Sequence, residues 1–158
     1  MVKKILVAYY SHSGNTEKIA KAIGKITGGT LFKIEPVQSY PTSYNDVVEQ
    51  AKKEISKGYM PELKSVLENA EFYDEIYIGT PNWWSTMAPP VAKFLTDNNF
   101  NGKKILPFCT HGGGGIGHIH RDIIKLCPFS TVADCFEVYG NGGFGIEEKL
   151  ERWIKKGN

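Results

Sequence analysis

The sequence has few cysteines, and they are poorly spaced for a disulfide framework. Its 158 residues include three cysteines, at positions 109, 127 and 135, with no Cys-x-x-Cys pair. An odd number without such a pair is unlike the disulfide scaffolds of small secreted domains. We therefore expect reduced thiols and a cytoplasmic location.

Long hydrophobic runs are also absent. Residues 5–10 form an apolar run of six residues, whereas a membrane-spanning helix needs about twenty. The Lys3-Lys4 pair before this run does not make it a secretory signal, because the run is too short for a signal peptide core. The sequence predicts no membrane span.

Neither sign of charge dominates. The chain has 19 Lys and Arg against 17 Asp and Glu, for a formal net charge of +2, and the two signs are interleaved. This pattern gives neither a basic nucleic-acid-binding face nor an acidic tail, so we expect no nucleic-acid partner. The length and the 41% hydrophobic content are typical of one globular domain, which we predict to span residues 1–158.

Short apolar runs alternate with segments of helical periodicity. The runs lie at about 3–10, 31–34, 76–80, 104–110 and 132–139, and the helical segments at about 19–26, 44–55, 89–95, 119–126 and 146–154. Five strands separated by helices predict an α/β fold, a doubly wound parallel sheet with helices on both faces. Ligands of such sheets bind at the carboxyl ends of the strands.

The loop after the first strand has the composition of an anion site. It reads Ser11, His12, Ser13, Gly14, Asn15, Thr16 and leads directly into a helix. The unpaired N–H groups and the dipole of a helix N-terminus favour a negative charge there. One cap needs only one such residue, and no Walker motif is present, so the loop predicts binding of a monophosphate.

Glycine is abundant in only two places. Nine of the 17 glycines lie at positions 112, 113, 114, 115, 117, 140, 142, 143 and 145. Gly112-x-Gly114-x-x-Gly117 formally matches a dinucleotide-binding fingerprint, with Glu137 about twenty residues later. Such a site needs a βαβαβ unit after its first strand, but only one more strand follows. The match is therefore interpreted as incidental.

Three loops together resemble those of the flavodoxin-like FMN proteins. Ser-x-Ser-Gly-Asn-Thr at 11–16 is similar to the family's phosphate loop, and the resemblance continues at 79–84 and 110–113, as in a bacterial flavodoxin-like subgroup. It covers nearly the whole chain and implies a five-stranded sheet in the order 2-1-3-4-5. This order places Pro107 inside the sheet, although its missing N–H favours an edge strand or a bulge.

The resemblance implies a binding site for FMN made by these loops. Its ring would lie between residues 81–86 and 110–115, with backbone N–H groups of the glycine loop near its pyrimidine edge. The implied cofactor contacts are Ser11, His12, Ser13, Gly14, Asn15, Thr16, Pro81, Asn82, Trp83, Trp84, Ser85, Thr110, His111, Gly112 and Gly113. We expect one of the two tryptophans to stack on the flavin and the other to be structural.

Histidine and cysteine near the glycine loop raise the question of a metal. Cys109, His111, His118 and His120 fit no structural zinc spacing, so we predict no metal site. His111 adjoins the expected flavin edge, where it could donate a proton or stabilise reduced flavin. The alternative is a solvated loop histidine.

Two functions of the flavodoxin-like class remain open. One is electron transfer between partner proteins through non-covalent FMN; the other is an NAD(P)H-dependent FMN reductase of quinones or nitro compounds, acting as a monomer or homodimer. A flavin-free regulatory module is a third. The near-neutral charge weakens the carrier assignment, because the family's carriers are typically acidic. No glycine lies between Gly79 and Gly102, which predicts a poorly stabilised one-electron-reduced flavin.

Overall fold

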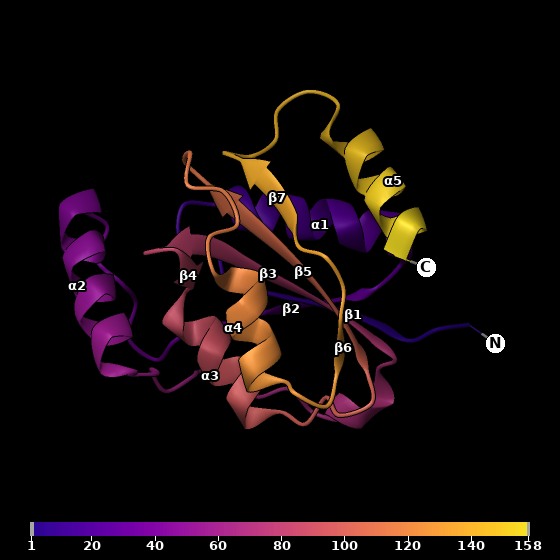
Figure 1. The fold of residues 1–158 in the computed structure, drawn as a ribbon, viewed down its shortest axis with the longest axis horizontal. Helices are drawn as coiled ribbons and strands as arrows, with labels where there is room; N and C mark the ends of the chain where they lie inside the picture. The colour runs from indigo at the N-terminus through magenta and orange to yellow at the C-terminus, as the bar shows by residue number, and fades with distance from the viewer. Residues whose placement is uncertain (1, 158) are drawn as a thin grey trace.

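The computed structural model describes residues 2–157, with a parallel β-sheet at its centre (Figure 1). The strands of this sheet are β1 (Ile5–Tyr9), β2 (Thr30–Lys33), β3 (Glu75–Trp83), β5 (Lys104–His111), β6 (Thr131–Val132) and β7 (Phe136–Tyr139). Their order is β2-β1-β3-β5-β6, with β7 also beside β5, and all these pairs are parallel. With β6 and β7 counted as one interrupted strand, this is the predicted order 2-1-3-4-5.

Helices cover both faces of the sheet, as predicted (Figure 1). They are α1 (Asn15–Thr27), α2 (Tyr44–Lys57), α3 (Pro89–Asp97), α4 (Ile119–Leu126) and α5 (Ile146–Gly157), with a 3₁₀ turn η1 (Ala70–Phe72). Successive β1 residues enter different cores: Leu6 packs in the core that holds α3 and α4 residues, and Val7 in the core that holds α1 and α5 residues. Burial on both faces explains why the central strands β1, β3 and β5 are continuous apolar runs.

The predicted fifth strand, 132–139, is interrupted at residues 133–135. The Ala133 N–H donates to the Ile105 carbonyl over 2.8 Å, so Ile105 directs its backbone groups toward this interrupted strand. Pro107, two residues further along β5, faces the same side and has no N–H to donate. The break therefore lies where β5 lacks a donor, which explains a proline inside the sheet.

The segment 82–88, between the predicted strand 76–80 and the predicted helical segment 89–95, contains a β-hairpin. Strand β3 continues through Pro81 to Trp83, and β4 (Thr86–Met87) pairs with it antiparallel. Trp84 and Ser85 form the two-residue turn with φ of 54° and 67°. Positive φ at both positions is the geometry that Asn-Gly usually supplies, so this sequence carried no recognisable hairpin signal.

Three properties of residues 2–157 bear on the predicted protein class. No helix in this range is long and apolar enough to cross a membrane. Within the same range, no group of three or more His, Cys, Asp or Glu side chains could hold a metal ion. Cys109, Cys127 and Cys135 are free thiols.

Candidate functional site

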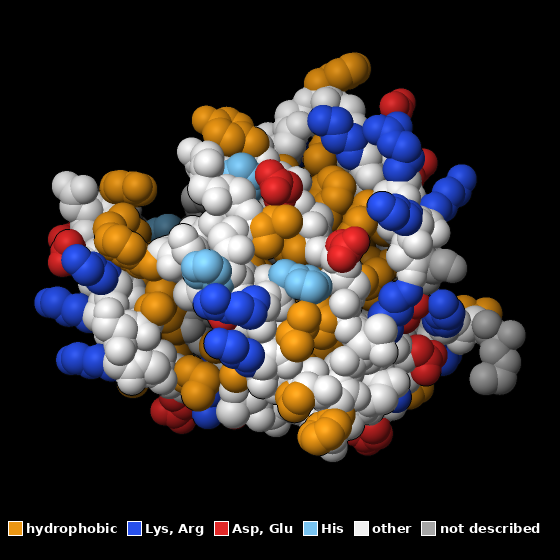
Figure 2. All heavy atoms as spheres, in the orientation of Figure 1, with side chains coloured by type: hydrophobic (Ala, Val, Ile, Leu, Met, Phe, Trp, Pro, Cys, Tyr) orange, Lys and Arg blue, Asp and Glu red, His pale blue; other side chains and the backbone are white. Residues whose placement is uncertain are grey.

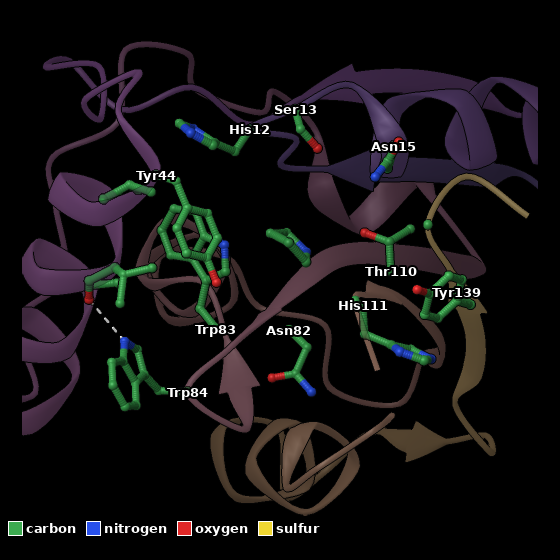
Figure 3. Close-up of a pocket in the computed structure, with 16 residues that line it drawn as sticks. His12, Ser13, Asn15, Tyr44, Asn82, Trp83, Trp84, Thr110, His111 and Tyr139 are labelled. Carbon is green, nitrogen blue, oxygen red and sulfur yellow. Dashed lines mark hydrogen bonds between the residues drawn. The ribbon is translucent and has the colours of Figure 1, made fainter. Parts of the chain in front are cut away.

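A cleft of about 600 Å³ lies at the carboxyl edge of the sheet (Figure 3). Neighbouring strand ends meet there because Tyr9 is in register with Gly79, and Pro81 with Thr110. Ten of the predicted site residues line the cleft: His12, Ser13, Asn15, Pro81, Asn82, Trp83, Trp84, Thr110, His111 and Gly112. The structure thus brings all three predicted loops to one cavity.

The other five predicted residues, Ser11, Gly14, Thr16, Ser85 and Gly113, are not among the lining residues. All five make hydrogen bonds that fix the loops. The Gly14 N–H donates to the Ser11 hydroxyl over 3.1 Å. The Thr16 hydroxyl, in a side chain only 1% exposed, shares a 2.7 Å hydrogen bond with the Thr110 hydroxyl, joining the loops after β1 and β5.

Loop 11–16 presents the start of α1 to the cleft. Gly14 has φ of 99°, and the helix begins at Asn15 with no side chain hydrogen-bonded as its cap. The first N–H bonded within the helix is that of Lys18, which donates to the Gly14 carbonyl over 3.1 Å. The preceding N–H groups of the first turn are the donors that helix N-termini offer to anions.

Asn82 links the hairpin to the glycine loop. Its Nδ2 donates to the Gly115 carbonyl over 2.7 Å, and its Oδ1 accepts from the Ser85 N–H over 2.9 Å. A second link comes from the His118 N–H, which donates to the Ser85 carbonyl over 2.6 Å. The Asn82 side chain and this backbone hydrogen bond together fix the distance between the two loops that enclose the cleft.

Replacing Asn82 with alanine is expected to destabilise the fold by about 1–3 kcal/mol, because both hydrogen bonds are lost in a partly buried place. Urea unfolding monitored by circular dichroism measures this change. Asn101→Ala, in the exposed turn before β5, is the matched control. Equal effects of the two substitutions would show that Asn82 does not couple the loops.

The two tryptophans have different surroundings. Trp83 is half-buried, and its ring meets Tyr10, Tyr40 and His12 edge to face, with centroids 5.6, 5.0 and 5.9 Å away. Trp84 is 49% exposed, and its Nε1 donates to the Val48 carbonyl in α2 over 2.9 Å. Trp83 is therefore part of an aromatic cluster beside the cleft, whereas Trp84 contacts α2.

The tyrosines around Trp83 are held in their neutral form. Burial raises the pKa of Tyr10, and burial followed by the hydrogen bond to Glu54 raises the pKa of Tyr40, whose hydroxyl donates to Glu54 Oε1 over 2.6 Å. On the other face of the sheet, burial, with a smaller contribution from Glu17, raises the pKa of Tyr9 to about 12. The aromatic cluster thus carries no phenolate charge near neutral pH.

These shifts predict a loss of stability at alkaline pH. A phenol whose pKa is higher in the folded state stabilises the fold fully below its unfolded value of 10.0, and this contribution is lost as the pH rises above 10 through the folded value. Tyr40→Phe is expected to make the fall of the unfolding free energy with rising pH less steep, by about 0.7 kcal/mol per pH unit on average between pH 9 and 11 and by at most about 1.4 kcal/mol per pH unit above that. Urea titrations between pH 9 and 11 measure the slope, and an unchanged slope contradicts the assignment.

The His111 side chain is only 8% exposed, and it contacts other groups of the protein. Its Nδ1 accepts from the Gly113 N–H over 3.0 Å, and its Nε2 lies 3.3 Å from Glu137 Oε1. An accepting Nδ1 assigns the proton of the neutral ring to Nε2. The ring thereby holds the glycine loop, and the solvated histidine considered above does not fit this burial.

Six further residues line the cleft: Tyr44, Val47, Val48, Ala51, Tyr139 and Gly140. None of them is among the residues predicted from the sequence. Of these residues, Tyr139 alone could have been suspected from the sequence, because it directly precedes the second glycine cluster. The α2 residues follow the same helical stripe that a core-facing helix shows, so periodicity could not distinguish a cleft wall from a core. Figure 2 shows hydrophobic side chains exposed beside α2 and near the end of β7.

The fold and the cleft define a class: doubly wound α/β proteins with a ligand site at the strand ends, where a helix N-terminus and aromatic side chains meet. A family model described as flavodoxin matches residues 4–156. The chain belongs to the flavodoxin family.

Solved structures similar to this chain have the same fold. A Bacteroides eggerthii protein described as a flavoprotein is 30% identical, with a TM-score of 0.87 and coverage of 98% of this chain and 97% of that one. A Bacteroides uniformis protein described in the same way is 29% identical, with a TM-score of 0.84 and coverage of 98% and 99%. A Lactobacillus acidophilus flavoprotein in complex with FMN is 21% identical, with a TM-score of 0.80 and coverage of 96% and 99%.

Proposed function

We propose that this protein binds FMN non-covalently in the cleft and transfers electrons through it. The observation that carries the proposal is the uncapped N-terminus of α1, which opens on the same cavity as Trp83 and the glycine loop. A phosphate can accept hydrogen bonds from the free N–H groups of the helix N-terminus, and a planar ring can pack against Trp83. Membership of the flavodoxin family and the FMN complex of the Lactobacillus relative support this cofactor.

The residues of the cleft fit FMN in chemistry. Ser13, Asn15 and the first-turn N–H groups of α1 would hold the phosphate without a cation. Trp83 would give the ring an apolar neighbour that excludes water, and the Gly112 backbone would face its polar edge. Bound FMN supplies the redox chemistry, whereas the protein positions it and controls its surroundings.

His111 has a positioning role in this proposal. Its bond to the Gly113 N–H fixes the glycine loop that would face the flavin. Both ring nitrogens face groups of the same chain, Gly113 on one side and Glu137 on the other. We therefore assign His111 to loop geometry rather than to proton donation.

A second candidate is an FMN-dependent reductase that takes electrons from NAD(P)H. The observation that favours it is the extension of the cleft to α2, beyond the three loops that would hold FMN. An electron carrier needs only an exposed flavin edge, whereas a reductase needs room for a substrate beside the flavin.

Spectroscopy of the FMN-loaded protein tests the proposal. We expect apoprotein to bind one FMN with a shift of the flavin absorbance bands, and dithionite to reduce it reversibly. NAD(P)H oxidation with an added acceptor distinguishes the candidates: steady turnover supports the reductase, and reduction only through a separate flavodoxin reductase supports the carrier. Failure to bind FMN would refute both.

A further inference from the structure

A second groove lies beside the β3–β4 hairpin. Its volume is about 320 Å³, near the lower end of the range for small-ligand sites. Its walls come from the end of α2, from β4, and from α3 and α4. Thr86 and Met87 of the hairpin line this groove, whereas residues 81–84 of the same hairpin line the cleft. Among residues 2–157, none lines both, so the groove is a separate site.

The lining of this groove is mostly apolar and includes two methionines. Ile55 contributes from α2, Met87 from β4 and Leu126 from the end of α4, and Met60 follows α2. Met87 is buried, whereas Met60 and Leu126 are 37% and 38% exposed. The Thr96 hydroxyl donates to Met60 Sδ over 3.6 Å, which joins Met60 to α3. Methionine side chains adapt to the shape of an apolar ligand, so the groove can accept an alkyl chain.

Two charged side chains line the groove, and one of them is already paired. Asp122 Oδ2 accepts from the Thr86 hydroxyl over 2.6 Å, and Arg121 Nε lies 3.3 Å from Asp122 Oδ1. Lys125, one turn later in α4, has no ion pair with any of residues 2–157. Figure 2 shows further Lys and Arg side chains over α2 and α4. The uncompensated charge of the groove is therefore positive.

We propose that this groove binds a small anionic amphiphile, a free monocarboxylate with an alkyl chain. The chain would lie against Met60 and Met87, and the carboxylate would lie beside Lys125, the one unpaired charge of the lining. A second negative charge on the ligand would approach Asp122, which favours a monoanion over a dianion. The groove is separate from the cleft, so this inference does not depend on the binding of FMN.

Isothermal titration calorimetry with octanoate tests the proposal. We expect saturable binding of one octanoate per chain, at least tenfold tighter than binding of octylammonium and at least threefold tighter than binding of octanol. These three probes share one alkyl chain and differ in the charge of the head group. Hexanoate, which lacks two CH₂ groups, should bind about tenfold more weakly than octanoate, because each buried CH₂ strengthens binding about fourfold.

Variants locate the site. Lys125→Met removes the charge and keeps an apolar stem, so octanoate affinity should fall at least threefold while octanol affinity is unchanged. Lys149→Met, at an exposed position of α5 outside the lining, is the matched control. Met60→Asp places a carboxylate in the groove and should weaken octanoate binding at least tenfold. Its control is Val66→Asp, because Val66 is 81% exposed and lies outside the lining.

Addition of FMN distinguishes the groove from the cleft. Octanoate affinity should change less than twofold at saturating FMN, whereas competition by FMN would place octanoate in the cleft and overturn the inference. Equal binding of octanoate and octylammonium, or equal effects of Lys125→Met and Lys149→Met, would also overturn it. So would binding to phosphatidylglycerol vesicles without binding of free octanoate. Octanoate binding by a protein that does not bind FMN would support this inference and refute the proposed function.

Discussion

Asn15→Asp is expected to lower the affinity for FMN about 100-fold while leaving the apoprotein at least as stable as the wild type. Asn15 is the first residue of α1 and lines the cleft. A carboxylate there would lie close to the phosphate, and two such charges in a partly buried site repel by about 3 kcal/mol. The same carboxylate interacts favourably with the helix dipole, by about 0.3–1 kcal/mol.

The opposite signs of these two effects make the result specific. FMN titration followed by flavin fluorescence measures the affinity, and urea unfolding of apoprotein measures the stability. Asn101→Asp makes the same change of charge in the turn before β5 and should alter neither quantity appreciably. If Asn15→Asp bound FMN as tightly as Asn101→Asp, the phosphate would not lie on loop 11–16.

Gly117→Ala is expected to destabilise the protein by about 2–4 kcal/mol, from backbone strain and steric overlap together. Gly117 has φ of +56°, and an added Cβ would lie 2.7 Å from the Ser85 carbonyl oxygen. The hairpin and the α4 end would have to separate, which would also disturb the Asn82 link. FMN affinity should therefore fall together with stability.

Gly102→Ala separates the two causes. Gly102 has φ of +77°, but an added Cβ there meets nothing within 4 Å. It should cost about 1 kcal/mol from backbone strain alone, without an effect on FMN affinity. Equal losses of stability at the two positions would show that the close approach of Gly117 to Ser85 contributes nothing.

The sheet and its helices could be predicted because each depends on a local pattern. Strands buried on both faces require continuous apolar runs. The order 2-1-3-4-5 also agrees with the structure, but it was implied by the family resemblance and not by a local pattern. The C-terminal ends of α1 and α2 were also predictable, because a glycine commonly follows a helix there. Gly28 and Gly58 take φ of 74° and 67° at these C-terminal caps. Such signals are local and need no knowledge of tertiary contacts.

Features maintained by tertiary contacts were not predictable. The Trp84-Ser85 turn depends on Asn82 in the same hairpin, but also on α2 and on Gly117, which are both more than 30 residues away in the chain. The break in the fifth strand lies opposite Pro107, about 27 residues earlier in the chain. The α2 residues that line the cleft are likewise held there by a tertiary contact, the hydrogen bond from the Trp84 indole to the Val48 carbonyl.

Comparison of FMN with riboflavin tests the central claim most directly. The claim is that the cleft binds FMN with its phosphate on loop 11–16. Riboflavin has the same ring but no phosphate, and each charge-assisted hydrogen bond to the phosphate contributes about 1.5–3 kcal/mol. Titration of wild-type apoprotein should give an affinity for FMN at least about 100-fold above that for riboflavin. Equal affinities would contradict the account.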